Sequence, residues 1–203
     1  MTPKQEERIR NKITRIRKEL AADKKHWGGY HHDGKGLRYL PPEHFIKLKD
    51  YKGGLRYLRW FDRAFPDDCG YPIFLFEWTI ILFMAGKTQE AEKKAIETFC
   101  SNTYLFDKFL GKEFLQFNKW ESSGWEQSSL TQYFNYSKSD AELYNFVVWL
   151  ESFLTSKNFY KIANEFIEID KQLKNEPVGP KRSKLVNRRY NLLDEISLAS
   201  ESF

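Results

Sequence analysis

The sequence has 203 residues, of which 41% are hydrophobic, and this is enough for one domain with a buried core. The formal net charge of +5 excludes a strongly basic chain, and two cysteines without a CxxC motif, Cys69 and Cys100, exclude a disulfide framework. Residues 1–12 show no secretory signal, and the longest apolar run, residues 71–86, contains Glu77 and is short for a membrane span. We therefore expect a cytoplasmic protein that makes no membrane contact.

The N-terminal segment predicts a basic amphipathic helix over residues 1–26. Thr2 and Pro3 are typical of a helix start. One narrow apolar stripe follows at helical spacing, and lysines and arginines cover the other faces. The stripe consists of Ile9, Ile13, Ile16 and Leu20. The glycines and prolines of residues 28–42 then predict a loop.

Residues 42–115 predict a helical core. Within it, an almost wholly apolar run from 73 to 84 is followed by the turn residue Gly86 and a helix to about residue 99. A further helix is expected over residues 103–115.

The C-terminal part predicts a second helical hairpin and a last basic helix. The hairpin covers residues 140–175, after a loop, and the basic helix covers residues 181–198. No segment shows the alternation of a strand. We predict an all-α fold in a single domain, residues 1–203, with stacked antiparallel helical hairpins between two basic amphipathic helices.

The spacing around Gly86 is typical of a helical repeat. Trp78 and Thr79 form a large-then-small pair, Leu82 is bulky, and the small Ala91 follows the turn, where it lets the second helix approach the first. Ala95 and Thr98 continue that face. The pattern resembles the tetratricopeptide repeat family.

Two less complete units extend this resemblance to about half of the chain. One runs from Tyr51 through Gly54 to the turn that begins at Pro66. The other, residues 143–173, has matching apolar positions but departs from the family at Lys157, where the family has a turn glycine.

The resemblance implies a scaffold that binds partners along the first helix of each pair. In the best unit the inner positions, which are all apolar, are Ile73, Phe76, Ile80, Phe83 and Met84. The Lys and Asn clamp of some family members is absent. Two alternatives follow: this surface receives an apolar helix of a partner, or another part of the chain covers it.

We therefore expect a non-catalytic protein–protein interaction scaffold, adaptor or regulatory subunit, whose partner is another protein or a peptide helix. No catalytic residue and no cofactor is predicted. The histidines and Asp33 of the first loop could ligate a metal, but they show no metal-binding motif, so we predict no metal site; an enzyme with a metal at His31 and His32 is a third hypothesis.

The alternative function is an accessory protein that binds nucleic acid through its basic terminal helices. The candidate contacts are Arg8, Arg15, Lys18, Lys181, Arg182, Arg188 and Arg189. Trp27, Tyr30 and Tyr39 would be available to stack on bases. Ordinary solvent-exposed helix faces would explain the same residues.

Overall fold

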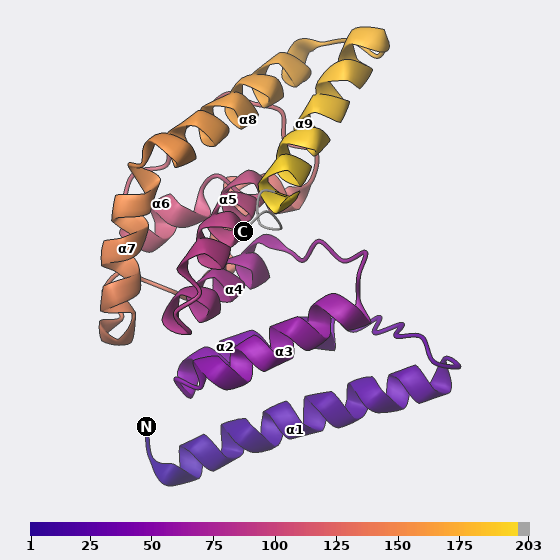
Figure 1. Cartoon of the computed structure of the whole chain (residues 1–203), viewed down its shortest axis with the longest axis vertical. Helices are drawn as coiled ribbons and strands as arrows, with labels where there is room; N and C mark the ends of the chain where they lie inside the picture. The colour runs from indigo at the N-terminus through magenta and orange to yellow at the C-terminus, as the bar shows by residue number, and fades with distance from the viewer. Residues whose placement is uncertain (199–203) are drawn as a thin grey trace. The chain divides into compact units, whose positions relative to one another are not determined.

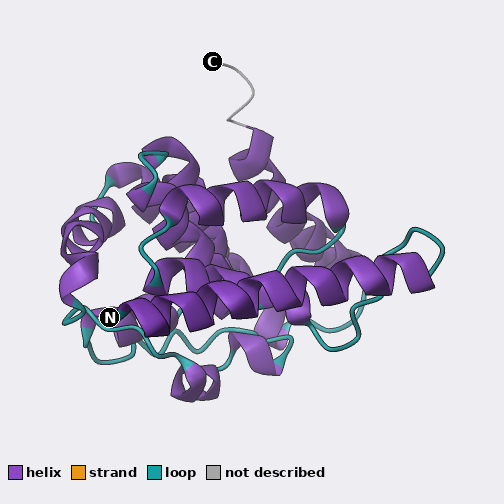
Figure 2. Ribbon diagram, turned by 90° about the horizontal axis from the view of Figure 1, so that it is seen from below, coloured by secondary structure: helices purple, strands orange, loops and turns teal. Residues whose placement is uncertain are grey.

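The computed structural model describes residues 1–198, apart from the side chains of residues 193 and 196–198. It confirms the all-α fold, because this part of the chain forms helices and loops and contains no strand (Figure 2). The α-helices are α1 (Pro3–His26), α2 (Pro41–Lys47), α3 (Tyr51–Ala64), α4 (Pro72–Met84), α5 (Thr88–Ser101), α6 (Leu105–Leu110), α7 (Tyr144–Leu154), α8 (Lys157–Asn175) and α9 (Pro180–Leu198). Short 3-10 helices are η1 (Leu37–Tyr39), η2 (Gly124–Glu126), η3 (Ser128–Tyr133) and η4 (Ala141–Leu143).

The contacts within the chain divide it into two compact units. The first unit contains residues 1–70 and 80–87, and the second contains residues 71–79 and the chain from residue 88 onward. Helix α4 is therefore shared, with its first part in the second unit and its last part in the first. The expected single domain stays a prediction.

The first unit is built on the long helix α1. A capping box starts this helix: the Thr2 hydroxyl accepts from the Gln5 N–H, and the Gln5 side chain accepts from the Thr2 N–H. Its buried residues are Ile13, Ile16 and Leu20, three members of the predicted stripe. Helix α1 packs against α2, and α2 packs against α3 (Figure 1).

Gly54 brings α3 close to the C-terminal part of α4, which belongs to the same unit. A Cβ atom at Gly54 would lie 2.9 Å from Ile81 Cδ1 and 3.1 Å from its Cγ2. The Ile81 side chain therefore occupies the space that any larger residue at position 54 would need.

The turn after α4 has the conformation that the sequence predicts. Gly86 has a φ of 77°, and its N–H donates to the Phe83 carbonyl at 2.9 Å. The small residues Ala91 and Ala95 of the following helix, α5, are fully buried.

The second unit has a core of aromatic rings around Phe76. The ring centroids of its neighbours lie between 4.7 and 6.0 Å away. These neighbours are Phe106, Phe109, Phe134, Tyr136 and Phe146. Around this core, α5 packs against α8 and α9, and α8 packs against both α7 and α9.

Helix α6 is shorter than predicted. It ends at Leu110 because Gly111 adopts a left-handed conformation with a φ of 64°, and the Lys112 N–H turns back to the Asp107 carbonyl at 2.9 Å. The expected continuation to residue 115 is wrong.

Candidate anion-binding site

Two helices of the first unit place arginines around one cavity. On α1 the lining residues are three, four and seven positions apart, so they share a face. They are Arg10, Ile13, Thr14 and Arg17. On α3 the same spacing rule brings together Gly53, Arg56 and Tyr57.

The cavity has a volume of about 290 Å³ and an apolar floor. Ile13, Phe45 and Tyr57, which form this floor, belong to a buried cluster of the first unit. The rings of Phe45 and Tyr57 are 6.1 Å apart, and the Tyr57 ring also lies 5.2 Å from that of Trp60. The cavity therefore combines an aromatic floor with a cationic rim.

The positive charge of the rim is only partly compensated. Arg10 lies 3.9 Å from the Asp50 carboxylate, and both side chains are partly exposed. Neither Arg17 nor Arg56, both exposed, forms an ion pair with a carboxylate within residues 1–198. Such arginines provide forked donors for an anion.

Tyr57 lines the cavity and is 4% exposed. Its hydroxyl donates to the Arg38 carbonyl at 2.7 Å, and burial raises its pKa, so the group stays protonated at neutral pH. The hydroxyl of Thr14 is likewise engaged, because it donates to the Arg10 carbonyl at 3.0 Å.

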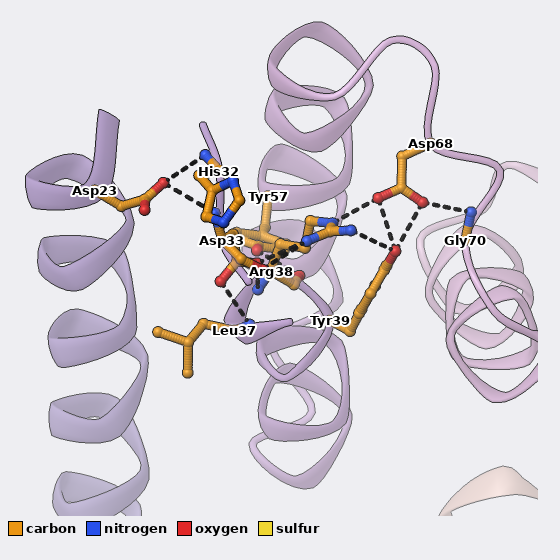
Figure 3. Close-up of polar contacts among 9 residues, drawn as sticks. All are labelled: Asp23, His32, Asp33, Leu37, Arg38, Tyr39, Tyr57, Asp68 and Gly70. Atoms are coloured by element: carbon orange, nitrogen blue, oxygen red, sulfur yellow. Dashed lines mark hydrogen bonds and ion pairs between the residues drawn. The ribbon is translucent and has the colours of Figure 1, made fainter. Parts of the chain in front are cut away.

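Tyr57 is bonded to a cluster of polar contacts among Asp33, Arg38, Tyr39 and Asp68, which we call the Arg38 clamp (Figure 3). The Arg38 guanidinium donates to the Asp33 carboxylate at 3.0 Å, to the Asp68 carboxylate at 2.5 Å and to the Tyr39 hydroxyl at 2.9 Å. Tyr39 in turn donates to Asp68 at 2.7 Å. The clamp therefore links the loop after α1 to the segment after α3.

Hydrogen bonds also fix the loop itself. The Asp33 carboxylate accepts from the N–H groups of Leu37 and Arg38, both at 2.9 Å, and the Asp23 carboxylate of α1 accepts from the N–H groups of His32 and Asp33. Asp33 is 5% exposed. These two carboxylates therefore hold the loop to the end of α1 and to η1.

The pKa shifts in the clamp agree with a structural role. Burial would raise the pKa of Asp68, but hydrogen bonds from Tyr39, Gly70 and Arg38 hold it below the usual value. Burial and the Asp68 carboxylate raise the pKa of Tyr39 to about 12. At neutral pH the clamp therefore keeps an ionised Asp68 and a protonated Tyr39.

The histidines of the loop pack against aromatic rings. The ring centroid of His31 lies 4.9 Å from that of Phe65 and 5.7 Å from that of Trp60. The ring centroids of His32 and Trp27 are 4.9 Å apart. Burial lowers the pKa of His31. Residues 1–198 contain no group of three His, Cys, Asp or Glu side chains that could hold a metal ion.

The apolar strip predicted to bind a partner is largely buried. Phe76 and Ile80 have no exposed surface and Ile73 is 8% exposed, whereas Phe83 and Met84 are half-buried. For Phe76 the covering groups are the aromatic rings of the second unit. This corresponds to the alternative in which another part of the chain covers the strip at Phe76.

The basic residues of α9 are used in contacts within the second unit. Lys181 pairs with Glu176 at 2.6 Å, and Arg182 donates to the carbonyls of Leu173 and Glu176. Arg188 pairs with Glu165 and Glu195. Arg189 pairs with the buried Asp170 at 2.8 Å and with Glu126 at 3.3 Å.

The basic residues of α1 have a different environment. Arg8, Arg15 and Lys18 are exposed, and of these Arg15 lies 3.6 Å from Glu19. The first unit has 18 Lys and Arg against 10 Asp and Glu, a formal charge of +8, whereas the second has 15 against 18, a charge of −3. The net positive charge of the protein therefore belongs to the first unit.

Sequence reasoning identified the basic character of α1 but missed the cavity. Arg10 and Arg17 are seven residues apart around Ile13, which could have indicated a basic edge beside the apolar stripe. Arg56 could not be assigned to the same site, because its distance from α1 depends on the packing of α2 between them.

Comparison with protein-family models, with curated proteins and with solved structures gives no match for this chain. None of the helices within residues 1–198 combines the length and the apolar character that crossing a membrane requires.

Proposed function

We propose that this protein is a non-catalytic, cytoplasmic accessory protein that binds single-stranded nucleic acid through the basic surface of α1 and α3. The observation that carries this proposal is the charge of +8 on the first unit, with exposed arginines that lack acidic partners. Trp27 and Tyr30, at the end of α1, are 50% and 81% exposed. Exposed rings beside basic residues are typical of surfaces on which unpaired bases stack.

Salt-dependent binding of a fluorescent 20-nucleotide single strand tests this function. We expect the affinity of the full-length protein to fall linearly with salt on a log–log plot, because bound phosphates release counterions. The double variant Arg8→Gln with Lys18→Gln should reduce the slope by about 0.7 for each lost phosphate contact.

The matched control is Lys157→Gln with Lys161→Gln, which removes two exposed charges from α8 of the second unit. This variant should bind like the wild type. Salt-independent binding, or an equal loss in both double variants, would contradict the proposal.

A second function, binding of another protein by an adaptor that resembles tetratricopeptide repeats, is supported by α7. Tyr144 and Val148, one helical turn apart, are 68% and 51% exposed on this helix. The substitution Val148→Asp should then release a co-purifying protein without changing the melting temperature. Retention of that protein would argue against this surface.

A further inference from the structure

We propose that the cavity between α1, α2 and α3 binds a nucleoside monophosphate unit, with its phosphomonoester between the arginines and its flat base on the aromatic floor. This inference deepens the proposed nucleic-acid binding and rests on it in part. What it adds is the chemical class of the ligand that this one cavity binds. The unit could be a free mononucleotide or the 5′-phosphorylated end of a strand, since both present the same chemistry.

The charge of the rim fits a dianion. Arg10, Arg17 and Arg56 contribute three positive charges, of which Asp50 compensates one through its contact with Arg10. The remaining charge of about +2 equals that of a phosphomonoester at neutral pH with opposite sign, about −1.5 to −2. An internal phosphodiester or a carboxylate carries only a single negative charge, so either would leave the rim uncompensated.

The arrangement of the donors also fits a phosphate. Arg10 and Arg17 come from α1 and Arg56 comes from α3, so the guanidinium groups lie on two helices that border the same cavity. Guanidinium groups bind phosphate oxygens in pairs. Arg17 and Arg56 have no carboxylate partner to displace within the described residues.

The floor favours an aromatic body attached to that phosphate. Phe45 and Tyr57 provide rings, and the Tyr57 hydroxyl is already bound to the Arg38 carbonyl. Phe45 is 8% exposed and Tyr57 is 4% exposed, so the floor offers a small aromatic contact surface and no free hydroxyl. A volume of about 290 Å³ is at the small end of ligand pockets, which suits one nucleotide unit.

Tyr57, one residue of the floor, is held in place by a hydrogen bond before a ligand arrives. The Arg38 clamp holds the carbonyl to which Tyr57 is bonded, and the clamp atoms are partnered with each other. At Gly53, a Cβ atom would lie 2.4 Å from Asp50 Oδ2 and 2.8 Å from Phe45 Cε1, so a larger residue there would displace Asp50 or Phe45 beside the cavity. Such pre-organisation lowers the entropic cost of binding.

The test uses the full-length protein and four probes: AMP, adenosine, and one 10-nucleotide RNA with either a 5′-phosphate or a 5′-hydroxyl. We expect each phosphorylated probe to bind at least about tenfold more tightly than its unphosphorylated counterpart, as expected for loss of charge-assisted hydrogen bonds. A larger gain in affinity from the phosphate on the strand than on adenosine assigns the strand end, and the reverse assigns the free nucleotide.

The substitutions Arg17→Gln and Arg56→Gln should each abolish this preference. Arg59→Gln, which removes an exposed charge from the same helix but not from the cavity, is the matched control and should keep it. Arg56→Lys retains the charge without the fork and should give an intermediate preference. Unchanged melting temperatures establish that the variants are folded.

Two outcomes would overturn the inference. One is equal affinity for phosphorylated and unphosphorylated probes; the other is Arg56-dependent binding of a Glu-rich peptide as tight as that of AMP. The 5′-hydroxyl strand separates the two proposals: if it binds in a salt-dependent way without a phosphate preference, the function stands and this inference fails. If AMP binds and neither strand does, the function fails and the free-nucleotide assignment stands.

Discussion

Gly54 shows how a single residue controls the packing of α3. The helix interior is an unfavourable place for glycine, and exchange for alanine would normally stabilise a helix by about 1 kcal/mol. Here the added methyl group would lie 2.9 Å from Ile81 Cδ1, and two further atoms of Ile81 lie within 3.3 Å. The close contact therefore opposes the gain in helix propensity.

We predict that Gly54→Ala lowers the free energy of unfolding by about 1–2 kcal/mol, because overpacking of a core costs about 1–3 kcal/mol and exceeds the helical gain. Urea denaturation measures this difference. The double variant Gly54→Ala with Ile81→Val removes Cδ1 and should recover part of the loss. Destabilisation by the double variant equal to the sum of the two single variants would show that the contact is not responsible.

Helix α9 illustrates why the role of a charged helix is hard to predict from sequence. From the sequence, its arginines could face solvent or contact a nucleic acid, because a basic amphipathic pattern is the same in both cases. The structure pairs Arg188 with Glu165 and Arg189 with Asp170, both on α8. Arg189 also pairs with Glu126 at the end of η2. Partners so far apart in sequence become neighbours only through the packing of α8 against α9.

We predict that Arg189→Gln destabilises the protein by about 3–5 kcal/mol, whereas Arg188→Gln costs about 0–1 kcal/mol. Removing Arg189 leaves the fully buried Asp170, whose second carboxylate oxygen already has no hydrogen-bond partner, without its cation. Arg188 is 41% exposed and its partners are partly exposed.

Thermal unfolding gives the two stabilities, and thiol labelling gives a local measurement. Cys100 is buried and Cys69 is exposed, so native protein should react rapidly only at Cys69. Faster labelling of Cys100 in Arg189→Gln than in Arg188→Gln is expected. Equal labelling and equal stability in both variants would contradict the prediction.

The features that sequence predicted well are those set by local chemistry. The Gly86 turn needs a residue that tolerates positive φ, and the burial of Ala91 and Ala95 follows from their spacing after that turn. The cavity could not be predicted in the same way, because Phe45 and Arg56 reach it from separate helices.

At the scale of the whole molecule, the two units divide α4 between them. Residues 71–79 belong with the second unit and residues 80–87 with the first, and the helix is continuous across this division. Loss of order in one half of the helix should therefore destabilise the unit that contains the other half.

We predict that Phe76→Ala, which creates a cavity in the second unit and should cost about 3–5 kcal/mol, also lowers hydrogen-exchange protection in α3 of the first unit. The comparison is Phe159→Ala, which removes a buried ring of the second unit on α8 rather than on α4. That variant should leave α3 less affected. Equal effects on α3 would mean that α4 does not couple the units.

The same division has a consequence for the order in which the protein forms during synthesis. A nascent chain that has emerged only to residue 70 lacks Ile81, the side chain that packs at Gly54. The ribosome must release residues 71–79, which belong to the second unit, before residues 80–87 can complete the first. The N-terminal unit can therefore reach its final packing only when the second unit has begun to appear.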